Sequence, residues 1–397
     1  MKPLLPGATG ADGRPVTLGV MGGGQLGRMF VQAAQAMGYF TAVLDPDKTS
    51  PAGLVAHYHV DADYTDEQGL AQLMQRSAAI TTEFENVPAP ALMTLGAHRP
   101  VAPAGECVAV CQDRAAEKRH FVRSGVPCAP FAVIASDADL AAVPDALLPG
   151  ILKTARLGYD GKGQVRVADR AALAAAWADL KQVPCVLEQR LALSAELSVI
   201  VARGADGAMV ELPVQHNLHR DGILAVTQVP APGVDTALQA EAVAAARRLA
   251  DGMGYVGVLC VEFFVVDAGA GRQALVANEM APRPHNSGHY SIDACDVSQF
   301  ELQVRCLAGL PLPVPRLHSP AVMLNLLGDL WFDAAGRERS PDWAAVLALP
   351  GVHLHLYGKA SARRGRKMGH LTVTAADAGA ARAVALQVAA LLGLPAF

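Results

Sequence analysis

Two apolar segments joined by a short turn set the strongest constraint on how this chain can fold, and each is associated with one glutamate. Residues 257–266 form the first segment and contain Glu262, while residues 274–277 form the second and lie just before Glu279. Residues 267–272 between them include two glycines and predict a tight hairpin turn. A hairpin folded symmetrically about this turn places the two glutamates opposite each other, with Cβ atoms roughly 4.5–5.5 Å apart.

Two carboxylates at that separation repel each other unless a cation or a shared proton lies between them. Magnesium prefers oxygen ligands and typically takes one or two carboxylates together with substrate phosphates. Two acids facing solvent at a sheet edge are the structural alternative. The polar residues that follow, among them Arg283, His285 and Asn286, favour the metal. We therefore predict that Glu262 and Glu279 hold one or two Mg²⁺ ions.

Length and composition narrow the class of protein. A chain of 397 residues with 52% hydrophobic residues is not disordered and suits two or three domains. A net charge of -4 and the lack of a long basic run argue against a nucleic-acid partner. Seven cysteines without a C-x-x-C pair fit a reducing compartment, without structural disulfides or a zinc cage. With no signal-peptide core and no membrane-spanning run, we expect a cytoplasmic protein without membrane contact.

The N-terminal part predicts an open α/β domain at 16–105. A strand at 16–21 leads into the glycine loop 22–27, then a helix, then a strand at 40–44 that ends at Asp45. This matches the G-x-G-x-x-G dinucleotide fingerprint with an acid about twenty residues further on. Such a loop needs only a tight turn and a helix N-terminus that can hold any anion, so another phosphate would fit equally well. An NAD-dependent oxidoreductase is therefore an alternative of a different class.

A further predicted strand, residues 78–82, delivers acids to the carboxyl end of this sheet, where ligands of open α/β sheets bind. Glu83 and Glu85 can act as ribose-binding carboxylates there. The structural alternative is that Asn86 caps the following segment, and the sequence leaves both interpretations open.

Residues 106–124 predict a helix that is rich in charge. Its charged residues include Asp113, Arg114, Glu117, Lys118 and Arg119. We interpret most of them as a solvated helix face.

A second glycine-rich loop carries a stronger phosphate signal. A strand at 151–152 presents Lys153, and residues 158–163 then contain three glycines with Lys162 among them. Backbone N–H groups of such a loop can surround phosphate oxygens. No G-K-[ST] opens a helix, so this is not a Walker A loop. A plain hairpin turn would explain the glycines but not the lysine before them.

The strand predicted at 185–191 suits adenine, because an apolar slot with backbone donors and acceptors recognises that base. Glu188 within it could take a ribose hydroxyl or the adenine amino group. Residues 215–222 break the apolar pattern and predict a polar loop. His216 and His219 in that loop are interpreted as surface residues, because no cysteine or third histidine lies at zinc-ligand spacing.

A proline-rich linker at 310–315 precedes the C-terminal part. Strands are predicted at 321–327, 352–356 and 371–374, with helices near 341–348 and 379–392. This α+β piece is small for independent stability. Five cations in the nine positions 359–367 could be a solvated hairpin or a site for a phosphate monoester.

The chain resembles the ATP-grasp superfamily in six stretches: residues 22–29, 83–86, 158–164, 216–224, 278–289 and 365–370. Within it, the chain is similar to the family of 5-(carboxyamino)imidazole ribonucleotide synthetases, the ATPase subunit of phosphoribosylaminoimidazole carboxylase. The resemblance spans residue 16 to the C-terminus and implies a cytoplasmic homodimer. It implies a tail at 1–15, an open parallel α/β (pre-ATP-grasp) domain at 16–112, an ATP-grasp domain at 113–312 and a small C-terminal α+β domain at 313–397.

The resemblance implies that ATP lies between the two halves of the grasp domain. Arg114 and Lys153 would contact its phosphates, residues 188–191 its adenine and Glu196 its ribose, while His219 would face the nucleotide. The residues expected to bind ATP are Arg114, Lys153, Gly158, Tyr159, Asp160, Gly161, Lys162, Gly163, Gln164, Glu188, Gln189, Arg190, Leu191, Glu196, His219, Asn278 and Glu279.

The resemblance also implies a site for aminoimidazole ribonucleotide and bicarbonate. Lys359 and Arg366 would reach the ribonucleotide phosphate, and Arg283, His285 and Asn286 would hold bicarbonate or the intermediate made from it. The residues expected to bind substrate are Gly24, Gln25, Leu26, Glu83, Glu85, Tyr159, Lys162, Arg283, His285, Asn286, Lys359 and Arg366.

The implied reaction is carboxylation of the substrate amine through carboxyphosphate, with ATP and Mg²⁺ as cofactors. No biotin is expected, because the acceptor is the substrate's own amine. The residues expected to be catalytic are Lys153, Asp160, Arg283 and His285, with Asp160 chosen as the base. Another ATP-grasp ligase, such as formate-dependent glycinamide ribonucleotide transformylase, is the near alternative.

Overall fold

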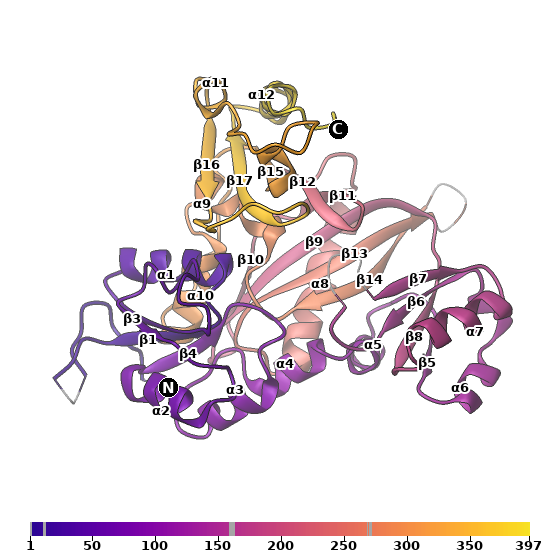
Figure 1. Cartoon of the computed structure of the whole chain (residues 1–397), viewed down its shortest axis with the longest axis horizontal. Helices are drawn as coiled ribbons and strands as arrows, with labels where there is room; N and C mark the ends of the chain where they lie inside the picture. The colour runs from indigo at the N-terminus through magenta and orange to yellow at the C-terminus, as the bar shows by residue number, and fades with distance from the viewer. Residues whose placement is uncertain (1, 11–12, 159–162, 268, 270–271) are drawn as a thin grey trace.

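The computed structural model describes residues 2–10, 13–158, 163–267, 269 and 272–397 (Figure 1). Figure 1 shows the N-terminal part at the lower left, a long sheet running through the centre, a small sheet at the right and the C-terminal part above. The predicted residues Tyr159, Asp160, Gly161 and Lys162 lie outside the described residues. Among the described residues, no helix is both long and apolar enough to cross a membrane.

The N-terminal part is a parallel sheet in the order β3-β2-β1-β4, as the sequence predicted for an open α/β domain. Its strands are β1 (Thr17–Met21), β2 (Phe40–Leu44), β3 (Tyr58–Val60) and β4 (Ala79–Thr82). Its helices are α1 (Gln25–Ala36), α2 (Glu67–Arg76) and α3 (Ala89–Gly96). The three-residue strand β3 was not predicted, because it is too short to show an apolar pattern.

The charged segment 106–124 differs from its prediction in two ways. It forms two helices, α4 (Gly105–Cys111) and α5 (Arg114–Arg123), because Asp113 caps α5 by accepting the N–H groups of Ala115 and Ala116. The interpretation as a solvated face was wrong for its centre, since Glu117 is 2% exposed and Lys118 is 0% exposed.

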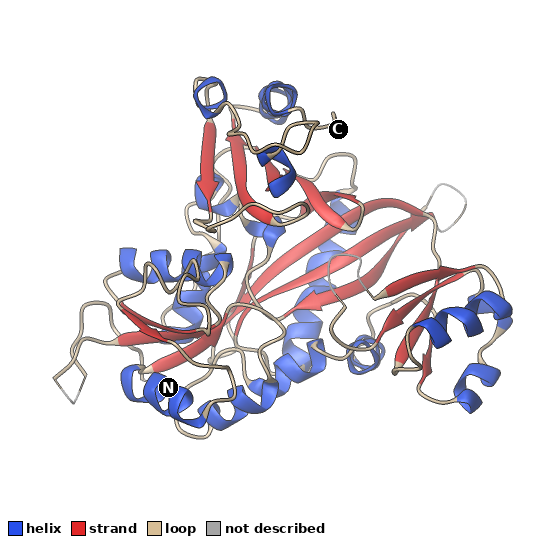
Figure 2. Cartoon of the chain, in the orientation of Figure 1, coloured by secondary structure: helices blue, strands red, loops and turns tan. Residues whose placement is uncertain are grey.

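The small sheet is antiparallel throughout, in the order β5-β8-β6-β7. Its strands are β5 (Phe131–Ile134), β6 (Gly150–Thr154), β7 (Gln164–Val167) and β8 (Cys185–Gln189). Helices α6 (Asp137–Ala142) and α7 (Arg170–Asp179) lie beside it (Figure 2). Leu173 and Trp177 of α7 pack into its core with Leu152 and Leu187.

The long sheet has the order β14-β13-β9-β11-β12-β15-β17-β16, with β10 beside β9. Its strands are β9 (Leu193–Arg203), β10 (Met209–Glu211), β11 (Gln215–Arg220), β12 (Ile223–Val229), β13 (Gly257–Asp267), β14 (Gln273–Ala281), β15 (Ala321–Leu327), β16 (Val352–Leu356) and β17 (Lys367–Thr374). The predicted polar loop at 215–222 was wrong, since most of it is β11. The C-terminal strands join this sheet through the pairing of β12 with β15.

Helices cover both faces of the long sheet. Leu249 of α8 packs with Val199 and Leu259 on one face, and Leu302 of α10 packs with Ile200 on the other. Further along the sheet, α12 packs on β15 and β17 (Figure 2). The remaining helices are α8 (Thr236–Gly252), α9 (Ser291–Ala294), α10 (Gln299–Ala308), α11 (Trp343–Leu347) and α12 (Ala378–Leu392). The two helices predicted near 341–348 and 379–392 are confirmed as α11 and α12.

Candidate active site

The predicted glutamate pair is confirmed by the strand register. Glu262 of β13 pairs directly with Glu279 of β14, and a register shift follows between Glu262 and Phe263. The hairpin turn lies between Asp267 and Gln273, as its glycines indicated. The two carboxylates therefore come from directly opposed residues on neighbouring strands.

A cavity of about 650 Å³ lies between the small sheet and this part of the long sheet. This volume is in the usual range for a small-molecule site. Many of the residues expected from the sequence line it: Arg114, Lys153, Gln164, Glu188, Gln189, Leu191, Glu196, His219, Glu262, Asn278, Glu279, His285 and Asn286. Gly158, Gly163 and Arg190 are described but are not among the lining residues.

The two acids of the pair differ in charge balance. Burial opposes ionisation of Glu279, but Arg114 lowers its pKa, and the two groups form an ion pair of 3.1 Å. Burial and the neighbouring Glu279 raise the pKa of Glu262 to about 7. One carboxylate is thus balanced by arginine and the other is not. A divalent cation fits this donor set, because it would offset the unbalanced carboxylate and bring oxygen ligands to its preferred number.

A lysine that the sequence analysis assigned to the surface lies beneath the cavity. Lys118 Nζ is 3.3 Å from Glu188 Oε1 and donates to the carbonyl of Asn278 at 2.9 Å. Lys153 Nζ donates to the other carboxylate oxygen of Glu188 at 3.0 Å. Burial lowers the pKa of Lys153, although Glu188 acts against it. Glu188, 3% exposed, thus binds two lysines, which differs from the predicted contact with ribose or adenine.

His219 lines the cavity, so its interpretation as an ordinary surface residue was wrong. Its Nδ1 lies 2.8 Å from Glu196 Oε2. Burial opposes protonation, but the hydrogen bond with Glu196 raises the pKa of His219. His216 on the same strand is partly buried, and burial lowers its pKa. The resemblance, rather than residue spacing, is what implied that Glu196 lies at the ribose and that His219 faces the nucleotide. Their pairing with each other was not predicted.

Asn286 adds an unsatisfied group to the cavity wall. It is 8% exposed, and neither polar atom of its side chain has a hydrogen-bond partner among the described residues. A buried amide without partners is costly, so this position suits a ligand with both donors and acceptors. Bicarbonate has both.

The first glycine loop holds carboxylates of the protein itself. The N–H groups of Gly24 and Gly27 donate to Glu83 at 2.9 and 3.0 Å, and that of Gly23 donates to Asp45 at 2.7 Å. A Cβ atom at Gly24 would approach Glu83 Oε1 to 2.4 Å, so glycine is required for this contact. The N-terminus of α1 therefore holds Glu83 where a dinucleotide site would hold pyrophosphate. This geometry contradicts the oxidoreductase alternative.

Arg283 connects the glutamate hairpin to the N-terminal part. Its guanidinium forms a close ion pair with Glu85 and also donates to the carbonyl of Pro284. Burial opposes ionisation of Glu85, but Arg283 lowers its pKa to about 2. Neither residue lines the 650 Å³ cavity, so they lie apart from the expected nucleotide residues.

The basic segment 359–367 forms the connection between β16 and β17. Lys359 Nζ donates to the carbonyl of Lys367 at 2.6 Å, and Arg366 donates to the carbonyl of Ser361 at 2.8 Å. The segment faces the N-terminal part, because a Cβ atom at Gly358 would lie 3.1 Å from Arg28 Nη1. Arg28, in the first turn of α1, is a cation that was not predicted as a site residue.

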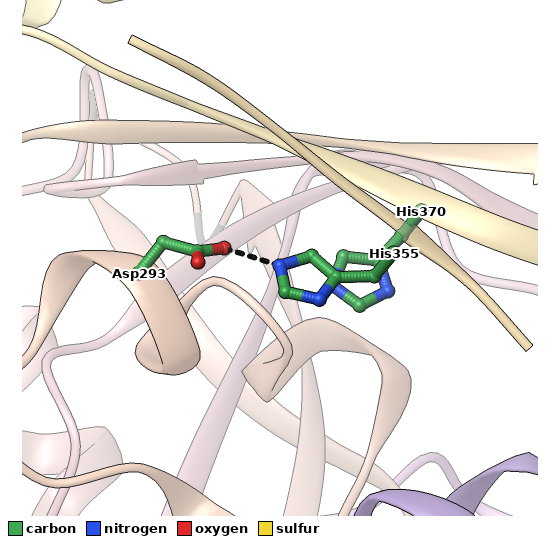
Figure 3. Close-up of side chains that lie close together, drawn as sticks. All are labelled: Asp293, His355 and His370. Atoms are coloured by element: carbon green, nitrogen blue, oxygen red, sulfur yellow. Dashed lines mark hydrogen bonds and ion pairs between the residues drawn. The ribbon is translucent and has the colours of Figure 1, made fainter.

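A histidine cluster lies outside the cavity, where β16 and β17 meet α9 (Figure 3). His355 Nε2 is 2.8 Å from Asp293 Oδ2, and the rings of His355 and His370 stack with centroids 4.5 Å apart and an interplanar angle of 12°. Their ligand atoms and the Asp293 carboxylate lie within 4.8 Å of one another. However, an imidazole lone pair lies in the plane of its ring, so two stacked rings cannot both point at one ion.

Because His289, next to this cluster, is buried, we expect the stability of the folded chain to depend on pH. Burial lowers its pKa to about 3, while an unfolded histidine titrates near 6.5. Below pH 6.5 the unfolded chain therefore binds more protons, and stability falls as pH drops, by roughly 2 kcal/mol at pH 5. Urea melts between pH 7 and 5 should show a shallower slope for His289→Asn than for wild type. Exposed His98→Asn is the control, and an equal slope in all three proteins would contradict the prediction.

Three family models match consecutive parts of the chain. The ribonucleotide synthetase preATP-grasp domain matches residues 16–112, the ATP-grasp domain matches 119–300, and the phosphoribosylaminoimidazole carboxylase C-terminal domain matches 321–384. Together with the cavity between two antiparallel sheets, they define the chain as an ATP-grasp protein.

Relatives narrow the family. The N5-carboxyaminoimidazole ribonucleotide synthase of Brucella melitensis is 44% identical over 90% of this chain and 95% of its own length. That of Bacillus subtilis is 40% identical over 89% and 90%. The chain belongs to the N5-carboxyaminoimidazole ribonucleotide synthase family.

Solved structures agree with this assignment. An ADP complex of N5-carboxyaminoimidazole ribonucleotide synthetase has a TM-score of 0.88 and 37% identity, covering 98% of both chains. The Aspergillus clavatus enzyme in complex with ADP and 5-aminoimidazole ribonucleotide has a TM-score of 0.85 and 30% identity, covering 96% of this chain and 99% of that one.

Proposed function

We propose that this chain catalyses the ATP-dependent carboxylation of 5-aminoimidazole ribonucleotide to 5-(carboxyamino)imidazole ribonucleotide in purine biosynthesis. The observation that carries the proposal is the cavity in which the acid pair Glu262 and Glu279 lies with Lys153 and Arg114. The Aspergillus clavatus relative, crystallised with ADP and the aminoimidazole ribonucleotide, supports the choice of substrates.

The nucleotide is proposed to lie with its phosphates near Lys153 and Arg114. Glu262 and Glu279 would hold Mg²⁺, which when bound offsets negative charge on the phosphates. Lys153 adds a buried cation, and in phosphoryl transfer such positioned charge supplies most of the catalysis. His219 of β11, which pairs with Glu196, offers a further polar contact to the nucleotide.

Bicarbonate is proposed to attack the γ-phosphate of ATP, giving carboxyphosphate and ADP. The unpaired amide of Asn286 and the ring of His285 would hold it beside the acid pair. The exocyclic amine of the ribonucleotide then takes up the carboxyl group and phosphate is released. Asp160 is retained as the proposed base, although it lies outside the described residues.

The ribonucleotide phosphate is proposed to bind between the basic segment 359–367 and the N-terminal part. Lys359 and Arg366 come from that segment, and Arg28 faces it from α1. The glycine-loop residues 24–26 and the acids Glu83 and Glu85 would lie toward the ribose and base. We also propose the domain limits 16–112, 113–312 and 313–397, a cytoplasmic location and a homodimer.

A coupled assay for ADP release tests the function. Release should require aminoimidazole ribonucleotide and bicarbonate together, and should be small with either alone. Formate with glycinamide ribonucleotide is the comparison for another ATP-grasp ligase. Equal rates with that pair would overturn the proposal.

Arg366→Ala should raise the KM for the ribonucleotide far more than the KM for ATP. A charge-assisted hydrogen bond to phosphate contributes about 1.5–3 kcal/mol, which corresponds to roughly a 10- to 150-fold increase. Steady-state kinetics with each substrate varied in turn measures the effect. Arg364→Ala is the matched control, since its side chain is 70% exposed and points to Asp329 at 3.9 Å. Equal increases in both KM values would show that Arg366 is not a dedicated phosphate contact.

A further inference from the structure

His285 lies between a buried serine and the acid pair. Its Nδ1 is 2.9 Å from Ser287 Oγ, and its Nε2 is 3.5 Å from Glu262 Oε1. The backbone of His285 is held as well. Its N–H donates to Gln299 Oε1 at 2.8 Å, and its carbonyl accepts from Gln299 Nε2 at 2.7 Å. The ring therefore has one nitrogen directed at the protein interior and the other at the cavity.

The direction of the hydrogen bonds behind Ser287 follows from the residues beneath it. The Gln215 amide nitrogen faces the carbonyl of Pro213, so its Oε1 faces Ser198 Oγ at 2.9 Å and is one of two acceptors of the Ser198 hydroxyl proton. Ser198 Oγ also accepts from Asn217 Nδ2 at 2.9 Å. Ser198 Oγ also lies 2.8 Å from Ser287 Oγ and is directed at it as a donor. The Ser287 hydroxyl therefore keeps its own proton to donate.

Two contacts decide where that proton goes. The backbone N–H of Ser287 is directed at His285 Nδ1 at 3.4 Å, and a second N–H on Nδ1 would oppose it. On the other side of the ring, Nε2 lies 3.5 Å from Glu262 Oε1, which accepts a hydrogen from Nε2 when Glu262 is ionised. Both contacts are satisfied when Nδ1 accepts from Ser287 and Nε2 carries the hydrogen. Ser287 and Ser198 are both fully buried, so water does not compete for these bonds.

We propose that Ser287, backed by Ser198, is a positioning residue that holds His285 in the Nε2–H form. His285 then acts as a hydrogen-bond donor to Glu262 and to the oxyanion in the cavity, and it does not remove a proton from the substrate. This rests on the proposed function for the identity of the oxyanion, but the ring form itself does not. As a donor to the proposed metal ligand Glu262, His285 is the kind of partner whose loss typically costs 10- to 100-fold in activity or metal affinity.

The first experiment determines directly which ring nitrogen of His285 carries the hydrogen. It does not depend on catalytic turnover. Long-range ¹H–¹⁵N correlation spectra of the full chain with ¹⁵N-labelled histidine, assigned with His285→Gln, should show the hydrogen on Nε2 of His285. Ser287→Ala should give a mixture of both forms. Ser291→Ala is the control, because Ser291 is another fully buried serine and its hydroxyl donates to the carbonyl of Gly288. A hydrogen on Nδ1 in the wild-type protein would overturn the proposal.

The second experiment tests whether His285 acts as a hydrogen-bond donor or as a base. The amide nitrogen of glutamine reaches about as far as Nε2, whereas that of asparagine reaches only as far as Nδ1. ADP release should therefore be at least about tenfold faster for His285→Gln than for His285→Asn. Equal loss in both variants would overturn the donor role. If the ring form is confirmed but wild-type ADP release does not depend on the ribonucleotide, the proposed function fails and the positioning role stands.

Discussion

Glu279→Gln is expected to abolish ATP turnover while the chain stays folded. The substitution keeps the size of the side chain but removes the charge that faces Glu262 and that pairs with Arg114 at 3.1 Å. The acid pair is then reduced to one carboxylate, and Arg114 is left without its partner. Loss of a preorganised charge at a reacting phosphate typically lowers kcat by about 100- to 1000-fold. ADP release, measured over a range of Mg²⁺ concentrations, tests this.

The control for this variant is Glu338→Gln, since Glu338 is exposed and lies far along the chain from the acid pair. Its kinetics should match wild type at every Mg²⁺ concentration. Circular dichroism of both variants checks that the fold is retained. Near-normal turnover of Glu279→Gln at low Mg²⁺ would mean that Glu279 is not a metal ligand, whatever its strand register.

The strand hairpin could be predicted because its determinants are local. Apolar runs on both sides of a glycine turn indicate which segments pair. Counting outward from the turn alone would place Glu262 opposite Asn278, and the register shift between Glu262 and Phe263 is what brings Glu279 opposite it. Strands with clear apolar runs, such as β2, β15 and β16, were predicted with the bounds that they have. Polar β11 was not, because its residues Gln215 and Asn217 are satisfied by Ser198 on another strand.

The glycine loop shows a second limit of sequence patterns. Glycines at 22–27 followed by Asp45 match a phosphate-binding fingerprint, and the turn and helix exist as predicted. The anion at the helix N-terminus is Glu83, which comes from the end of β4. Glycine is needed for close approach in both cases, so the pattern does not distinguish a bound phosphate from a carboxylate of the same chain.

The largest error was the prediction that the charged residues of segment 106–124 form a solvated face. The burial of Lys118 could not be predicted from the sequence. Lys118 lies in a helix whose neighbours along the chain are charged, so its periodicity is that of a solvated face. Its burial depends on Glu188 of β8 and on the carbonyl of Asn278 of β14, which are remote in sequence. A lysine is buried only where such partners exist.

Glu188→Gln is therefore expected to destabilise the fold strongly, by about 3–5 kcal/mol, because it leaves Lys118 and Lys153 facing each other without the carboxylate between them. Chemical denaturation with urea, followed by circular dichroism, measures the change. Glu301→Gln is the matched control: Glu301 pairs with Arg305 at 2.7 Å one helical turn away but is partly exposed. Such a pair contributes at most about 1 kcal/mol.

The same variant separates a structural role for Glu188 from the predicted contact with adenine or ribose. If the carboxylate serves the two lysines, the phosphates of added ADP supply the missing negative charge near Lys153. ADP should then raise the melting temperature of Glu188→Gln by more than it raises that of wild type, since ligands stabilise the state that they bind. If the carboxylate instead contacts the nucleoside, the variant should have wild-type stability without ligand and a smaller ADP shift. The two roles thus predict opposite changes in both measurements, and the buried position of Glu188 between two lysine Nζ atoms favours the first.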